Sequence, residues 1–237
     1  QLQAARAICS LADDVRAHVP ASAGLELIVS LASSGGEEAA RAYATSTLHK
    51  LAAGRAPPAL EALGGSRLAI ELLIRLLRAG AWLSPNESAV AGHEASQAAV
   101  ASLRHLSAQP AALTAIVDVG GVAALVETAG GGGPSGRQQA AHLLASLAAP
   151  PHSAAVVASG GVEALIGALG HGDGELTAAT ATALRHLVDV PSGQAAILRH
   201  GVAPTVELLN QPDPAVALDA LGVLRRLCAS LDSPPTA

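Results

Sequence analysis

The stretch Asp118-Val119-Gly120-Gly121-Val122 decides the fold, because its pattern returns along the chain at a fixed interval. It recurs as Ala158-Ser159-Gly160-Gly161-Val162 and, with a single glycine, as Arg199-His200-Gly201-Val202. The last glycine of the pattern advances by 40 residues each time. Self-similarity at a period of this size is typical of proteins built from stacked repeats. We therefore expect one structural unit for each return of the pattern.

A second marker, the motif Leu-x-x-Leu, keeps step with the first. Its copies are Leu48/Leu51, Leu103/Leu106, Leu144/Leu147, Leu184/Leu187 and Leu224/Leu227, with Ile8/Leu11 as a variant one period upstream. From Leu51 onward the last leucines advance by 55, 41, 40 and 40 residues. The glycine marker also extends upstream, to Gly64-Gly65 and Ala23-Gly24. Two markers with one period indicate stacked units, because no single unit of this kind buries its apolar faces alone.

Each unit is predicted to contain three helices. The first begins at a proline, whose missing N–H is not needed in the first turn, and we expect it at 110–118, 151–158 and 191–199. The glycine pair then ends this helix and turns the chain, because glycine accepts the left-handed conformation. The second helix carries a Val-x-x-Leu stripe and is expected at 122–128, 162–169 and 202–209. A long third helix follows, with start signals at Asp173 and at Asp213-Pro214.

The composition supports this interpretation and excludes several function classes. Of 237 residues, 50% are hydrophobic but only 1% are aromatic, which disfavours sheet folds that depend on aromatic side chains. The net charge of -5 argues against a general nucleic-acid binder, and no apolar run approaches the ~20 residues of a membrane span. Cys9 and Cys228 fit reduced thiols inside a cell. The absence of methionine, even at position 1, predicts a segment of a longer chain.

The unit of about 40 residues, its glycine turn, the Val-x-x-Leu second helix and the Ala-x-x-Leu-x-x-Leu third helix resemble armadillo repeats over essentially the whole chain. The resemblance implies an all-α fold, a right-handed α-solenoid of three-helix armadillo repeats whose third helices line a concave groove. A HEAT-like solenoid is the alternative, but HEAT units usually have two helices and lack the glycine turn. The resemblance places a third helix at 1–13 and repeats at about 14–54, 55–109, 110–149, 150–189 and 190–231.

Armadillo proteins mostly bind other proteins in this groove, often as extended peptides. In the peptide-binding members an asparagine precedes the closing leucine, but this chain has no asparagine there, which argues against a nuclear-import receptor. The replacements lean basic, so we expect an acidic helix or tail as partner. The alternative is that these are ordinary solvated positions. The position is Ser10 in the first helix, and the candidate protein-binding residues that follow are Lys50, His105, Ser146, His186 and Arg226.

One unit is irregular, because Gly65 to Gly121 spans 56 residues. The excess lies near residues 80–92, and insertions in repeat proteins map to loops that are often used for binding. Trp82, the only tryptophan, is a candidate protein-binding residue in this insertion, since tryptophan is enriched at interface hot spots. The alternative is that Trp82 folds back onto the second helix of its own unit.

No arrangement in the sequence predicts catalysis, a cofactor or a metal. None of the nine histidines is at ligand spacing from another His or Cys, and Ser, Asp and His form no triad pattern. The stretch 131–138 echoes a phosphate-binding loop but has Arg137-Gln138 where Lys-Ser/Thr is needed, and no strand precedes it. We interpret it, like 170–174 one unit later, as a flexible link between helices. The protein is therefore predicted not to be an enzyme.

We expect a non-catalytic protein–protein interaction scaffold or adaptor within a larger intracellular assembly. The alternative is the substrate-recognition arm of a U-box-type ubiquitin ligase, and a cargo-binding transport receptor is less favoured. The expected partners are other proteins, with neighbouring repeats or a cap upstream in the parent chain, and neither nucleic acid nor a membrane. The expected location is the cytoplasm, with the ciliary axoneme and the nucleus as further compartments.

Overall fold

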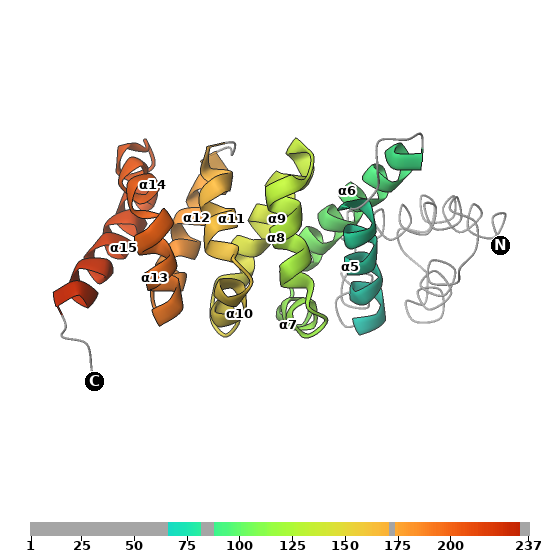
Figure 1. The fold of residues 1–237 in the computed structure, drawn as a ribbon, viewed down its shortest axis with the longest axis horizontal. Coiled ribbons are helices and arrows are strands. Elements are labelled where there is room, and N and C mark those ends of the chain that lie inside the picture. The colour runs from blue at the N-terminus through green and yellow to red at the C-terminus, as the bar shows by residue number, and fades with distance from the viewer. Residues whose placement is uncertain (1–65, 82–87, 171–173, 233–237) are drawn as a thin grey trace. The chain divides into compact units, whose positions relative to one another are not determined.

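The computed structural model describes residues 66–81, 88–170 and 174–232, and every regular element in these ranges is a helix (Figure 1). This confirms the predicted all-α class. The chain divides into two compact units, residues 1–124 and 125–237. The expected helix at 1–13, the repeat at 14–54 and the start of the repeat at 55–109 lie outside the described residues, as do Lys50 and Trp82.

In the first unit, three helices surround one apolar cluster. α5 (Arg67–Ala81) packs against both α6 (Ser88–Leu106) and α7 (Pro110–Asp118). Apolar residues recur along α5 at intervals of three and four, which is the spacing of one helix face. The large side chains that these helices bury completely are Ile70, Leu73, Ile74, Leu77, Leu103, Leu106 and Ile116.

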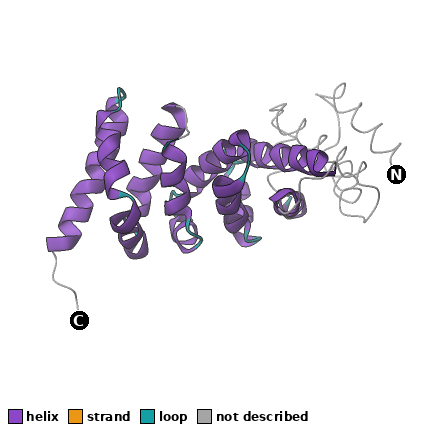
Figure 2. Cartoon of the chain, turned by 45° about the horizontal axis from the view of Figure 1, so that its top comes forward, coloured by secondary structure: helices purple, strands orange, loops and turns teal. Residues whose placement is uncertain are grey.

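In the second unit, successive third helices pack on one another. α8 (Gly121–Gly131) begins at the end of the first unit and continues into the second. The elements that follow are α9 (Pro134–Leu147), α10 (Ser153–Ala158), α11 (Gly161–Leu169), α12 (Gly174–Leu187), α13 (Pro191–His200), α14 (Val202–Glu207), the 3₁₀ turn η1 (Leu208–Asn210) and α15 (Pro214–Asp232). α12 packs against both α9 and α15, and α11 packs against α9 and α12. Short loops join α8 to α9, α9 to α10 and η1 to α15 (Figure 2), and residues 171–173, between α11 and α12, lie outside the described residues.

The leucine marker forms the buried seam of the third helices. Leu144, Leu147, Leu184 and Leu187 are completely buried, and Leu227 is 3% exposed. One or two turns earlier the buried side chains are small, which lets neighbouring helices approach closely: they are Ala140, Ala141, Thr180 and Ala181. The period of the sequence is therefore the period at which one third helix covers the next.

The two glycines of the turn have different tasks. The first adopts the left-handed conformation, with φ of 71° at Gly120 and 80° at Gly160, as predicted. The second lies where the first and second helices of a repeat meet. A Cβ at Gly161 would lie 2.8 Å from the carbonyl oxygen of Val156, and a Cβ at Gly121 would lie 2.8 Å from that of Ile116. Only glycine fits without displacing the backbone.

The third copy of the pattern, which has a single glycine, makes its turn without a left-handed residue. Gly201 has a φ of -111°, because this copy has no first glycine to take the positive φ. His200 instead continues α13, and the N–H of Gly201 donates to the carbonyl oxygen of Ile197 at 2.7 Å. The requirement for space persists, since a Cβ at Gly201 would lie 2.9 Å from Cδ1 of Ile166 and 3.1 Å from the carbonyl oxygen of Ile197.

Several helix boundaries differ from the prediction, and three of these differences change the links between helices. The first helix expected at 151–158 begins at Ser153. The link expected at 131–138 is only two residues long, because Gly131 still belongs to α8 and Pro134 begins α9. Proline is preorganised for the first turn, so the helix starts there directly. Part of the insertion at 80–92 is also helical, since α5 ends at Ala81 and α6 begins at Ser88.

The predicted start signal of the last third helix is confirmed. The Oδ1 of Asp213 accepts a hydrogen bond from the N–H of Ala215 at 2.9 Å, and Pro214 is the first helical residue. This bond satisfies one of the donors that a helix leaves unpaired at its start. Asp173, the equivalent signal one repeat earlier, lies outside the described residues.

We expect Leu147→Ala and Leu187→Ala each to lower the free energy of unfolding by ~2–5 kcal/mol, because both leucines are completely buried in the seam. Leu218→Ala is the matched control, since its side chain on α15 is 69% exposed, and it should change stability by less than about 0.5 kcal/mol. Urea unfolding followed by circular dichroism measures all three. Equal losses for the buried and exposed leucines would contradict this assignment of the seam.

We expect Gly161→Ala to destabilise the protein by ~1–3 kcal/mol, the usual cost of forcing a methyl group into a packed contact. Gly167→Ala on the same helix should instead stabilise it by about 0.8 kcal/mol, because alanine is the better helix former and a Cβ there meets nothing within 4 Å. Thermal unfolding of the two variants compares them directly. A stabilising Gly161→Ala would show that the turn has spare room.

Candidate functional site

The predicted groove residues lie at equivalent positions on the third helices. His105 is partly exposed on α6 in the first unit. In the second unit, Ser146 is exposed on α9, and His186 on α12 and Arg226 on α15 are partly exposed. Because α12 packs against both α9 and α15, these three equivalent positions share one side of the packed helices. We call Ser146, His186 and Arg226 the third-helix row. Their role in binding a partner stays a prediction, as does that of Lys50 and Trp82.

Carboxylates of neighbouring repeats hold the arginines of this region. Arg226 forms an ion pair with Asp189, which follows the C-terminus of α12. Arg185 lies on α12 next to His186, and its Nε is 2.8 Å from Oδ1 of Asp219 on α15. The hydroxyl of Thr182 donates to the other oxygen of Asp219 at 2.6 Å. These polar contacts join α12 to α15 and offset much of the positive charge that the sequence led us to expect.

The other two members of the row are uncharged or disfavour charge. The hydroxyl of Ser146 donates to the carbonyl oxygen of His142 at 3.1 Å, one turn earlier on α9. The pKa of His186 is lowered, first by burial and then by the nearby Arg185 guanidinium; Arg226 lowers it further, whereas Asp219 raises it. The neutral form of His186 is therefore favoured, and Arg226 supplies the charge of the row.

Sequence reasoning missed Asp189 and Asp219. The available signal was an acidic residue on one third helix and a basic residue on its neighbour, at positions that the period brings together. The 40-residue repeat compares equivalent positions only, and these pairs join positions that are not equivalent. Such contacts appear only when two repeats are placed against each other.

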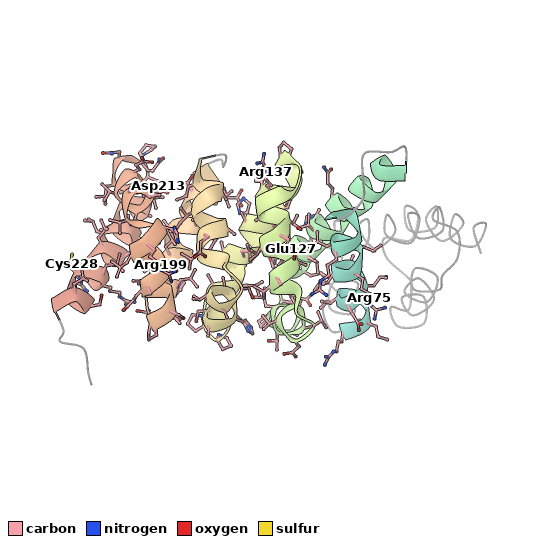
Figure 3. All side chains as sticks on the ribbon, viewed as in Figure 1. Arg75, Glu127, Arg137, Arg199, Asp213 and Cys228 are labelled. Atoms are coloured by element: carbon pink, nitrogen blue, oxygen red, sulfur yellow. The ribbon has the colours of Figure 1, made fainter. Side chains whose placement is uncertain are left out.

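A cavity of about 530 Å³ opens in the second unit between one repeat and the next. Its walls come from the end of α8, the first turns of α9, one face of α11 and the start of α12. Arg137 lines it and lies near the upper end of α9 in the view of Figure 3. The Nε of Arg137 is buried and has no hydrogen-bond partner among the described residues. The sequence pattern indicated a link between helices at Arg137, so it did not predict that Arg137 lies on α9 and lines a cavity.

The repeat formed by α13, α14 and α15 exposes apolar side chains. They are Leu198, Val202, Val206, Leu218, Leu221 and Leu231. At the equivalent positions one repeat earlier, Val162 and Ala181 are completely buried. The positions of Val202 and Leu221 are thus exposed on this repeat and covered one repeat earlier.

The described residues supply little else that could serve chemistry. They contain no group of three His, Cys, Asp or Glu side chains able to hold a metal ion. Cys228 is an exposed free thiol on α15. No single described helix is long and apolar enough to cross a membrane; Pro110–Asp118 and Gly121–Gly131 reach that length and composition only when counted together across a sharp bend.

The lowered pKa of His186 predicts a pH dependence of stability. The ordinary value is 6.5, so the unfolded chain binds the proton more tightly than the folded chain does. The contribution of neutral His186 is complete above pH 6.5 and is lost as the pH falls below it. Wild type should therefore lose more unfolding free energy than His186→Gln between about pH 7.5 and pH 5.5, as measured by urea unfolding. His200→Gln, at an exposed position on α13, is the control and should follow wild type; equal losses in all three proteins would contradict the prediction.

Comparison with known proteins rests on structure, since no protein-family model and no curated protein matches the sequence. An engineered protein is 29% identical to this chain, with a TM-score of 0.66 over 97% of this chain and 90% of that one. A designed armadillo repeat protein has a TM-score of 0.64 at 15% identity, over 95% and 92% of the two chains. A designed armadillo repeat protein in complex with the peptide (KR)4 has a TM-score of 0.61 at 14% identity, over the same shares. The chain therefore has the armadillo repeat fold, an α-solenoid of three-helix units.

Proposed function

We propose that this protein is a non-catalytic scaffold or adaptor that binds another protein along its third helices, within a larger assembly in the cytoplasm. The observation that carries the proposal is the fold, since a designed armadillo repeat protein of the same architecture was solved with a bound peptide. The third-helix row adds a series of partly exposed polar side chains at one position of successive repeats. A regular row of this kind suits an extended segment, because each repeat contributes one contact.

An acidic segment is the partner that the proposal favours. Arg226 is the charged member of the row, and its ion pair with Asp189 lies at the surface, where the two side chains are 41% and 57% exposed. Exposed ion pairs contribute little to stability, so a carboxylate of the partner can replace Asp189 at small cost. In its neutral form, His186 adds a hydrogen-bonding group and no charge. The peptide on the designed protein is basic, so a basic partner held by Asp189 is the outcome that the experiment must separate.

Charge reversal at Arg226 of the row, together with the predicted groove residue Lys50, tests the proposal. We expect Lys50→Glu combined with Arg226→Glu to reduce capture of the native partner from an extract of the source cell, because the two introduced glutamates repel an acidic segment. Asp189→Asn should increase capture, since it frees Arg226 from its ion pair. Quantitative mass spectrometry of the captured proteins provides the measurement, and circular dichroism verifies that each variant keeps its helices.

The double variant adds negative charge and Asp189→Asn removes one negative charge, so a basic partner would reverse both results: capture would rise for the first and fall for the second. Leu218→Ala is a control outside the row, on the exposed surface of α15. Unchanged capture by both charge variants, with normal helicity, would contradict binding along the third-helix row.

A further inference from the structure

Two positions without a side chain contribute to the wall of the cavity beside Arg137. Gly130 on α8 and Gly167 on α11 both line it, and a Cβ built on either would meet nothing within 4 Å. Alanines and Leu176 provide the remaining apolar wall. The hollow is therefore a feature of these residues at this junction and belongs to the second unit alone.

The repeats themselves show what is absent from the cavity. The position of Gly167 on α11 is occupied by Glu127 on α8 and by Glu207 on α14. The position of Arg137 on α9 is occupied by Thr177 and Ala217 in the next two third helices. Among the described repeats, only the junction between α9 and α11 combines an arginine on the third helix, Arg137, with a glycine on the facing second helix, Gly167. The guanidinium has thus no carboxylate from this position to pair with.

The side chains around the cavity suit the binding of a single carboxylate. Arg137 lines the cavity and is partly exposed, and its buried Nε has no hydrogen-bond partner among the described residues, so no neighbouring acceptor holds the guanidinium at that atom. Arginine binds carboxylates through two parallel hydrogen bonds, which strengthens the contact and orients it. The small apolar walls accept the methylene groups that carry such a carboxylate.

We propose that this cavity is a binding site for one glutamate or aspartate side chain of a protein partner, which enters over Gly167 and pairs with Arg137. The site rests on the proposed protein-binding function and adds to it an anchor away from the third-helix row. Glu163 also lines the cavity, one helical turn before Gly167 on α11. Its carboxylate disfavours a run of acidic residues, so the site selects an isolated acidic side chain with apolar neighbours.

The first experiment measures binding by the complete chain in solution. The probes are two blocked peptides, acetyl-Ala-Leu-Glu-Leu-Ala-amide and the same peptide with glutamine in the centre, titrated into ¹⁵N-labelled protein. We expect the glutamate peptide to shift backbone amide signals of α8, α9 and α11, and the glutamine peptide to bind about tenfold more weakly, as loss of one charge-assisted contact implies. Arg137→Gln should remove the difference between the peptides, and Glu163→Gln should tighten binding of the glutamate peptide.

The second experiment fills the site from within the chain. Gly167→Glu restores the residue that the other second helices carry and places a carboxylate opposite Arg137. We expect it to block the glutamate peptide and to raise the melting temperature above that of the isosteric Gly167→Gln by ~1–4 °C, the shift for a modest stabilisation in a chain of this size. The difference should vanish in the Arg137→Gln background.

The outcomes separate this site from the third-helix row. Pocket-centred shifts that require both the glutamate and Arg137 support the inference, whether or not row variants alter capture of the native partner. Equal binding of the two peptides, or equal melting temperatures of Gly167→Glu and Gly167→Gln in the presence of Arg137, would overturn it even if the row binds a partner. Lys50→Glu combined with Arg226→Glu should leave peptide binding at the cavity unchanged.

Discussion

The close approach of backbone to backbone at the second glycine of each turn is the constraint on which the repeat depends. At Gly121 and Gly161 the space for a side chain is already occupied by the carbonyl group of the preceding helix. This contact fixes where the second helix leaves the first, and so where its apolar stripe points. The third helix can then cover its neighbour with completely buried leucines such as Leu147 and Leu187. Packing density in such seams leaves no tolerance for a shifted register.

Most of the fold was predictable because the constraint is repeated in the sequence. Periodic glycine and leucine markers predicted three helices per unit, and α7, α8 and α9 through α15 follow that order. The departures have local causes. Pro134 starts a helix where glycine-rich sequence indicated a link, and Gly201 lacks the companion glycine that would allow a left-handed turn. Both arise because glycine has several roles, and here serves turns, close contacts and helix interiors.

The candidate sites were less predictable than the fold, for a physical reason. Position within the repeat predicted which side chains share a face, but the charge of that face depends on pairs across the junction. Asp189 neutralises Arg226, and Asp219 neutralises Arg185, across intervals unrelated to the period. At Arg137 the opposite holds: the facing second helix has Gly167 at the position where other repeats have a glutamate, so that position offers no carboxylate. A missing side chain cannot be recognised from one repeat alone. It is found only when the same position is compared among several repeats.

The junction at His200-Gly201 bears on how such arrays can be recombined. Of the two glycines, only the one that provides space is kept there, while the turn itself is made by extending α13. Exchange of whole repeats between proteins therefore needs to preserve this glycine at each splice, and the residue before it has to match its own turn: glycine where φ is positive, as at Gly120 and Gly160, or a helical residue such as His200. A splice placed directly before that glycine would carry the close contact intact into the new context, so modules cut at this point should be interchangeable in an engineered series.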